Sequence, residues 1–104
     1  MSQADGKRRH IRKIAAWPAW VRLHGSARFA KGHTKNVSRG GAYVVVPLDG
    51  ACSEGDEVDY VLGIRAEAGE HIVFQAVNGE AQVVRVEKTA EGLALRFAEE
   101  KDIT

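Results

Sequence analysis

The chain has 104 residues, of which 44% are hydrophobic and 28% charged, so it has room for one folded domain and is neither disordered nor fibrous. No run approaches the roughly 18 consecutive apolar residues of a membrane helix, and the N-terminus lacks the apolar core of a secretory signal. Cys52 is the single cysteine, which excludes an internal disulfide and leads us to expect a cytoplasmic protein.

The net charge of +1 hides an uneven distribution. Residues 1–13 contain five of the fifteen basic residues and one acidic residue, whereas residues 14–104 have a net charge of −3. A short basic arm on a mildly acidic body indicates an anionic partner that binds at one place. A general nucleic-acid binder is more often basic over a whole face, so we expect no nucleic-acid partner.

In chain order, we expect residues 1–6 to form a disordered tail and residues 7–13 a flexible arginine arm. Pro18 removes a backbone donor, so the chain enters the domain through an edge or a loop. A loop is also expected at Gly32-His33. Alternation of apolar and polar residues, apolar runs and intervening turn residues predict strands at 19–24, 27–31, 42–48, 58–64 and 93–97.

Residues 72–86 allow two interpretations. The runs 72–77 and 81–86 both resemble strands, and Asn78-Gly79 between them is the strongest short hairpin signal. The alternative is one long strand that bends at Gly79, because a glycine inside a strand often marks a bulge. The pattern alone favours the hairpin. About six short strands without a long amphipathic helix predict a small all-β domain, either a sandwich or a barrel.

Nothing in the sequence favours an enzyme. The four histidines are scattered singly, without a spacing that sets two ligands on one metal, so we expect no metal site. The carboxylates lie mostly in turns and on alternating polar faces, as on any solvated β surface. Cys52 has no local partner that would activate it, and no glycine-rich phosphate loop occurs.

The arginine arm has chemistry suited to a small ligand. Arg8, Arg9 and Arg12 carry planar guanidinium groups, which bind phosphate or the guanine edge in bidentate fashion and stack on flat rings. A solvated basic tail is the ordinary alternative. If the arm orders on binding, it can act as a switch.

A second segment precedes the apolar run that starts at residue 42. Asn36 and Ser38 are short hydrogen-bonding residues, and Gly40 and Gly41 permit positive φ and a close approach of the backbone to a ligand. Taken alone, this segment is better explained as a turn before a strand. Together with the arginine arm, it indicates one site for a ligand that is both anionic and flat.

The two segments match a known pair of motifs. Arg8-xxx-Arg12 followed by Asn36-x-Ser38-x-x-Gly41 resembles the RxxxR and [D/N]xSxxG motifs of the PilZ domain, the bacterial receptor module for cyclic di-GMP. The resemblance covers residues 7–98, with the arm at 7–13 and the barrel at 14–98, and leaves 99–104 as a tail. It implies a six-stranded antiparallel β-barrel with a flexible N-terminal arm and at most a short C-terminal helix. It also favours a single bent strand at 72–86, since family members usually have a glycine there.

The resemblance implies a role for each motif residue. Arg8 and Arg12 would bind the phosphates and guanine edges and stack on the bases, and Arg9 would assist them. Asn36 and Ser38 would contact a guanine or a phosphate, and Gly41 would keep the start of the following strand open to the ligand. The implied function is a non-enzymatic cyclic di-GMP receptor or adaptor that needs no cofactor. Binding would change the conformation of the arm and signal to an unidentified effector protein that controls motility, biofilm or exopolysaccharide.

Three further expectations remain open at this stage. Lys7, just before the first motif, is similar to the family type that holds two ligands and forms a ligand-dependent homodimer. One alternative is a PilZ-like protein-interaction module without nucleotide, as in pilus assembly, although such versions typically lack the arginines. The other is a small barrel that binds single-stranded RNA through the arm and Trp17 or Trp20, although these tryptophans are better explained by packing.

Overall fold

The computed structural model describes residues 12–47 and 51–103, and within them the chain is all β apart from one 3₁₀ turn at Lys88–Ala90. The expected tail and most of the arginine arm, residues 1–11, lie outside the described residues. The strands are β1 (Lys13–Ile14), β2 (Pro18–Leu23), β3 (Ala30–Ser38), β4 (Gly41–Val45), β5 (Glu57–Ala68), β6 (His71–Glu87) and β7 (Gly92–Phe97).

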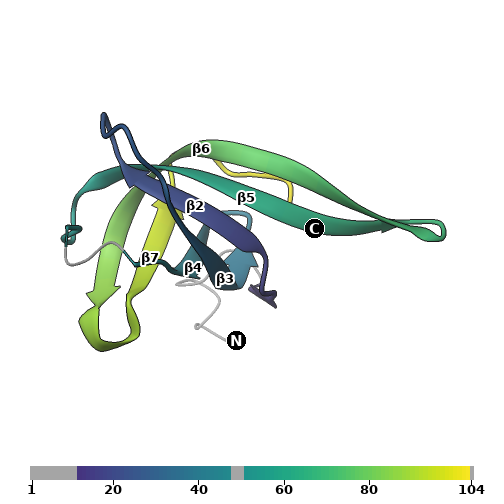
Figure 1. Ribbon diagram of the computed structural model, residues 1–104, viewed down its shortest axis with the longest axis horizontal. Coiled ribbons are helices and arrows are strands. Elements are labelled where there is room, and N and C mark those ends of the chain that lie inside the picture. The colour runs from purple at the N-terminus through teal and green to yellow at the C-terminus, as the bar shows by residue number, and fades with distance from the viewer. Residues whose placement is uncertain (1–11, 48–50, 104) are drawn as a thin grey trace, which may run out of the picture.

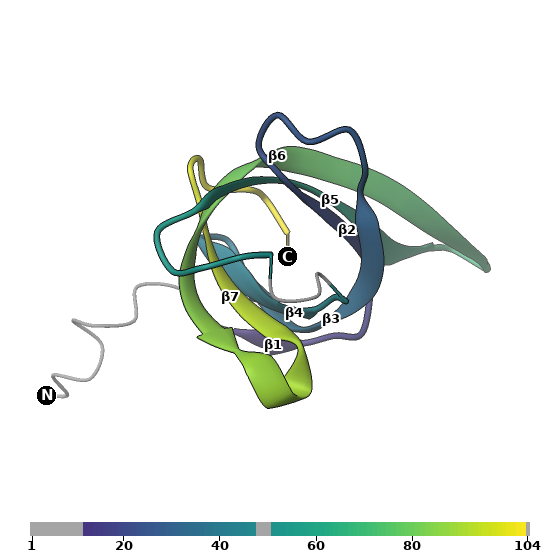
Figure 2. The same cartoon turned by 60° about the vertical axis from the view of Figure 1, so that its left-hand side comes forward.

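The strands form two three-stranded antiparallel meanders, β2-β3-β4 and β5-β6-β7 (Figure 1). The edges of the two meanders meet twice, where β2 pairs with β5 and β4 pairs with β7. These two seams close a six-stranded barrel, and β1 adds to β3 beside β2. Figure 2 shows the strands as a closed ring. The antiparallel β-barrel expected from the sequence is therefore confirmed.

The barrel core follows from the alternation that predicted the strands. In β5, every second residue from Val58 to Ile64 is buried, while the residues between them are partly exposed. The ring of Tyr60 stacks on that of Phe97 with 4.6 Å between centroids. Burial raises the pKa of Tyr60 to about 12, so the hydroxyl stays protonated inside the barrel.

Residues 71–87 form one strand, β6, so the single strand that the family resemblance favoured is confirmed and the hairpin that the pattern alone favoured at Asn78-Gly79 is wrong. Asn78 and Gly79 pair with Val61 and Tyr60 of β5 without interruption. A Cβ on Gly79 would lie 3.1 Å from Oη of Tyr60, so the glycine makes room for the tyrosine of the neighbouring strand. The chain reverses instead at Gly69, with φ of +65°, and the bulge in β6 lies between Val83 and Arg85.

The loop predicted at Gly32-His33 is also wrong. Both residues lie inside β3 and pair with Ala19 and Pro18 of β2. A Cβ on Gly32 would be only 1.8 Å from the carbonyl oxygen of Val45, so glycine is needed for close packing and not for a turn. The sequence pattern cannot distinguish these two uses of glycine.

The C-terminal residues 98–103 form neither helix nor strand; they follow β7 as an irregular tail. The N–H of Ala98 donates to the carbonyl of Glu80, and the N–H of Lys101 donates to the carbonyl of Arg39 at 2.9 Å. The tail then enters the ring of strands (Figure 2), where Ile103 is 4% exposed and part of the core. Within residues 12–47 and 51–103, no helix has the length and apolar character required to cross a membrane.

Candidate ligand-binding site

The second sequence motif forms the tight turn between β3 and β4. Ser38 pairs with Gly41 across a two-residue turn, Arg39-Gly40. The Ser38 hydroxyl donates to the carbonyl of Gly41 and accepts from the N–H of Gly40, both at 3.3 Å. Ser38 is 8% exposed, and its hydroxyl holds the turn in shape.

Gly41 is required for packing between strands. Its φ lies outside the positive range, so the residue does not use the freedom of glycine to adopt a positive φ. A Cβ at this position would lie 2.2 Å from the carbonyl oxygen of Leu95 in β7. The close backbone approach predicted at Gly41 is therefore present, and it serves the seam between β4 and β7.

The first motif reaches the turn through β1. Lys13 and Ile14 pair with Val37 and Asn36 of β3, which places Arg12 at the motif turn. Nη1 of Arg12 donates a hydrogen bond of 2.5 Å to Oδ1 of Asn36. The structure thus brings together Arg12, Asn36, Ser38, Gly40 and Gly41, whereas Arg8 and Arg9 lie outside the described residues.

Two further arginines flank the turn. Arg39 is exposed within it, and Arg96 of β7 pairs with Gly41 in register. Nη2 of Arg96 donates to Oε1 of Gln82 at 2.6 Å, which orients the guanidinium on the barrel surface. The alternation of Leu93, Leu95 and Phe97 placed Arg96 on the outer face, but only the strand register places it beside the turn.

The surface next to Asn36 also offers apolar area. Ile14, directly opposite Asn36, is 92% exposed. On the other side of Asn36, the Tyr43 hydroxyl donates to the carboxylate of Glu87, and this hydrogen bond is the main reason that the pKa of Tyr43 is raised. Cationic, amide and apolar groups therefore lie together around the end of β3, which suits a ligand with both phosphates and flat rings.

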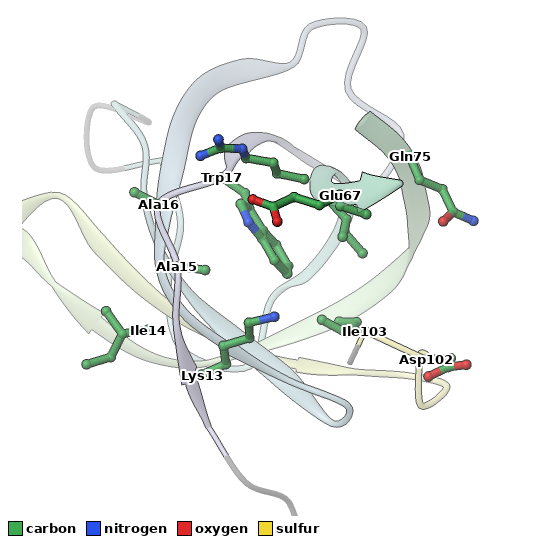
Figure 3. Close-up of a pocket in the computed structure, with 12 residues that line it drawn as sticks. Lys13, Ile14, Ala15, Ala16, Trp17, Glu67, Gln75, Asp102 and Ile103 are labelled. Carbon is green, nitrogen blue, oxygen red and sulfur yellow. The ribbon is translucent and has the colours of Figure 1, made fainter. Parts of the chain in front are cut away.

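A pocket of about 650 Å³ lies between β1 and β5 (Figure 3). Residues 13–17 form one wall, Arg65 and Glu67 contribute from β5, and Ile103 contributes from the tail. Trp17 is 6% exposed, and its backbone N–H donates to Oγ1 of Thr34 at 2.9 Å. This tryptophan is a packing residue, as the ordinary interpretation of the sequence held.

A separate charged cluster lies where β2, β5 and β6 run side by side. Asp59 accepts from Nε of Arg22 at 2.9 Å and contacts Nδ1 of His24 at 3.1 Å. The hydrogen bond between His24 and Asp59 raises the pKa of the histidine and lowers that of the carboxyl, which Arg22 lowers further. Asp59 lies directly opposite Glu80, so these cations relieve a repulsion between like charges.

Within the described residues, His24, Asp59 and Glu80 also place metal-ligating atoms within 4.8 Å of one another. Arg22 already neutralises Asp59, and the cluster shares no residue with the paired motifs. We therefore interpret it as a row of ion pairs. Residue spacing along the sequence cannot reveal it, because its members come from β2 and the turn after it, from β5 and from β6.

The structure is thus a small antiparallel β-barrel domain in which Arg12 of the first motif contacts Asn36 of the second. The model of the PilZ domain family matches residues 6–104, and the chain belongs to this family. Among solved structures it is similar to the Bacillus subtilis inhibitor of motility, MotI/DgrA, with a TM-score of 0.68 and 20% identity. The match covers 90% of this chain but only 44% of that protein, so the chain spans less than half its length. No curated protein sequence matches the chain significantly.

Proposed function

We propose that this PilZ domain is a receptor for cyclic di-GMP that holds the ligand between the N-terminal arm and the turn from β3 to β4. The observation that carries the proposal is the hydrogen bond between Arg12 and Asn36, one residue from each motif. Arg8, Arg9 and Arg12 would bind phosphates and guanine edges, while Asn36 and the turn residues would complete the site.

The surroundings of the turn support a compact anionic ligand. Arg39 and Arg96 add positive charge next to Gly41, and the exposed Ile14 offers apolar surface for a base. Single-stranded RNA binding is less well supported, because Trp17 is buried and Trp20 is half-buried beneath Lys31. A mononucleotide-sized ligand therefore suits the site better than a strand does.

The output would follow from ordering of the arm. When the arm folds over the ligand, it presents a new surface to an effector protein in the cytoplasm that controls motility, biofilm or exopolysaccharide. The similar structure from Bacillus subtilis is described as an inhibitor of motility, which favours motility among these outputs. Lys7, just before the first motif, agrees with a form that binds two ligands and dimerises on binding.

Isothermal titration with cyclic di-GMP tests the proposal. We expect saturable binding, and a loss of about 10- to 100-fold in affinity for Arg8→Ala and for Arg12→Ala, the range for a charge-assisted hydrogen bond. Arg28→Ala is the matched control, since Arg28 is exposed in the loop at the opposite end of β3 from the turn. Absence of binding to the wild type would refute the proposal, and unchanged affinity in both variants would refute the site assignment.

The second candidate is a protein-interaction module that works without nucleotide. The exposed apolar residues Ile72, Val73 and Phe74 on β6 favour a protein contact of some kind. This candidate predicts no heat on titration with cyclic di-GMP, so the same experiment separates the two.

A further inference from the structure

Residues 63–79 of β5 and β6, here called the β5–β6 ribbon, project from the barrel as two paired strands (Figure 1). β2 pairs with β5 only as far as Leu62, and β7 pairs with β6 only from Ala81. Residues 65–76 are all exposed. Within the described part of the chain, both outer edges of the β5–β6 ribbon therefore have no strand beside them.

Two backbone hydrogen bonds fix which backbone groups point outward from each strand. The carbonyl of Glu57 accepts from His24, on the β2 side of β5, and the carbonyl of Glu80 accepts from Ala98, on the β7 side of β6. Because these groups alternate along an antiparallel strand and the register is continuous, the outward residues follow by counting. They are Gly63, Arg65 and Glu67 on β5, and Ile72, Phe74, Ala76 and Asn78 on β6.

The two edges differ in how they are protected. The β5 edge carries the charged side chains of Arg65 and Glu67, which discourage another strand from pairing. The β6 edge has no Asp, Glu, Lys, Arg or Pro from His71 to Gly79, and the bulge in β6 begins only after Val83. Unprotected edges of this kind are templates for a further strand.

The side chains of the β6 edge are also apolar. Ile72 is 53% exposed, Val73 44% and Phe74 63%. An isolated hairpin with such residues in water is marginally stable, and covering it removes apolar surface from water. A partner that adds a strand here would supply both the missing hydrogen bonds and this burial.

We propose that the β6 edge pairs with the β6 edge of a second copy of this chain, antiparallel, with the two Phe74 residues facing each other across the twofold axis. In this register Ile72 faces Ala76, His71 faces Val77 and Glu70 faces Asn78. No charged side chain lies opposite a like charge.

Charge selects this register among its neighbours. If the axis lay at Gln75, Glu70 of each copy would face Glu80 of the other, and the two carboxylates would repel. If the axis lay at Val73, only residues 71–75 of β6 would pair. The register centred on Phe74 pairs residues 71–77, and it gives an aromatic cross-strand pair at the centre.

The resulting dimer is closed. The four strands lie in the order β5-β6-β6-β5, so both outer edges are the charged β5 edges. The dimer uses neither Arg12 nor the motif turn. It therefore goes beyond the proposed function and forms without nucleotide.

Sedimentation equilibrium of the full chain without nucleotide tests the surface. We expect a reversible dimer for the wild type and a monomer for Phe74→Lys, which places two ammonium groups opposite each other. Val84→Lys is the matched control and should remain dimeric, because Val84 is also exposed but lies where β6 pairs with β7. Circular dichroism establishes that both variants are folded. A monomeric wild type, or equal dimerisation of Phe74→Lys, overturns the proposal.

Cysteine cross-linking in a Cys52→Ala background tests the register. Facing Cα atoms at a hydrogen-bonded pair lie about 5.5 Å apart, within reach of a disulfide. We expect Phe74→Cys to form a covalent dimer rapidly. Ile72→Cys should react at least tenfold more slowly, because the two copies of residue 72 would be about 14 Å apart along the strands. Equal rates for the two variants would overturn the proposed register.

Discussion

Arg12 and Asn36 are separated by 24 residues in the sequence and joined by a hydrogen bond in the structure. This contact links β1 to the turn between β3 and β4, so it makes the two motifs one surface. The contact also affects the free energy of ligand binding, because the effects of substituting two residues in contact are not additive.

We predict non-additive loss of cyclic di-GMP affinity in a double-mutant cycle. Arg12→Ala and Asn36→Ala should each weaken binding, and the double variant should weaken it by less than the sum, with a coupling of about 0.5–3 kcal/mol. The physical reason is that each substitution already removes the positioning of its partner. Titration calorimetry on the four proteins measures the coupling. Strict additivity would show that the two side chains act on the ligand independently.

Gly41→Ala should destabilise the barrel. The added Cβ would meet the carbonyl of Leu95 at 2.2 Å, and backbone atoms of β7 can move only by opening the seam. We expect a loss of about 1–3 kcal/mol in the free energy of unfolding, as for other overpacked sites. Gly63→Ala is the matched control, since its Cβ would lie 3.7 Å from Pro18, an ordinary contact. Urea unfolding compares them, and equal stability of the two variants would contradict the packing role.

Ile103→Ala should destabilise the protein although the residue lies next to the chain end. Ile103 is 4% exposed and belongs to the core, so we expect a cost of about 2–4 kcal/mol. Ile14→Ala provides the comparison, because Ile14 is 92% exposed and should change stability by about 0.5 kcal/mol or less. Thermal and urea unfolding measure both. A neutral Ile103→Ala would mean that the tail does not pack in the barrel in solution.

The contact between His24 and Asp59 should stabilise the protein in a limited pH window. The pKa of His24 is raised from 6.5, so its stabilisation is complete below that value and is lost as pH rises through the folded-state pKa. The pKa of Asp59 is lowered from 3.8, so its stabilisation is complete above that value and is lost as pH falls through the folded-state pKa. Both contributions are therefore complete between pH 3.8 and 6.5.

His24→Gln should accordingly lower stability relative to the wild type most within that window, and the difference should shrink at high pH. Urea unfolding as a function of pH measures it. His33→Gln serves as a control, because His33 is exposed on β3 and has no part in the cluster. A difference between wild type and His24→Gln that is constant from pH 4 to 9 would contradict the assignment.

Cys52 should be unreactive in the folded protein. The residue is 5% exposed, and burial is the main cause that raises the pKa of its thiol, with a smaller effect from Asp56. Both effects lower the fraction of thiolate, which is the reactive form. A disulfide reagent should therefore label the native protein much more slowly than the protein unfolded in guanidinium chloride. Labelling at the same rate in both states would contradict the buried position.

The residue pattern predicted a small all-β domain, and the resemblance to the PilZ family implied that it is a barrel. The expected meeting of the two motifs is seen at Arg12 and Asn36. Alternation from Val58 to Ile64 reports a half-buried strand directly, because side chains on successive positions point to opposite faces. Asn78-Gly79 and Gly32-His33 were misleading for a common reason. Glycine permits turns, and it also permits close packing between strands, and only the neighbouring strand reveals which use applies.

The parts of the surface that sequence reasoning missed depend on register. Arg96 lies beside Gly41, and Asp59 lies between Arg22 and Glu80, because strands distant in sequence are paired at those positions. A shift of one residue in any of these strand pairings would turn the same side chains to the opposite face. Such neighbours therefore follow from the closed barrel and not from any local pattern.

The division of the barrel into two meanders bears on how the chain reaches its native state. Each meander contains only hairpin pairings between successive strands, which form in microseconds, whereas the seams β2–β5 and β4–β7 join distant segments. Docking of the preformed meanders at these seams should therefore limit the folding rate. The turn between β3 and β4 would then take shape early, while the Gly41 contact with Leu95 forms only at closure. Gly41→Ala obstructs this docking step and should consequently slow folding, an effect that stopped-flow kinetics can measure.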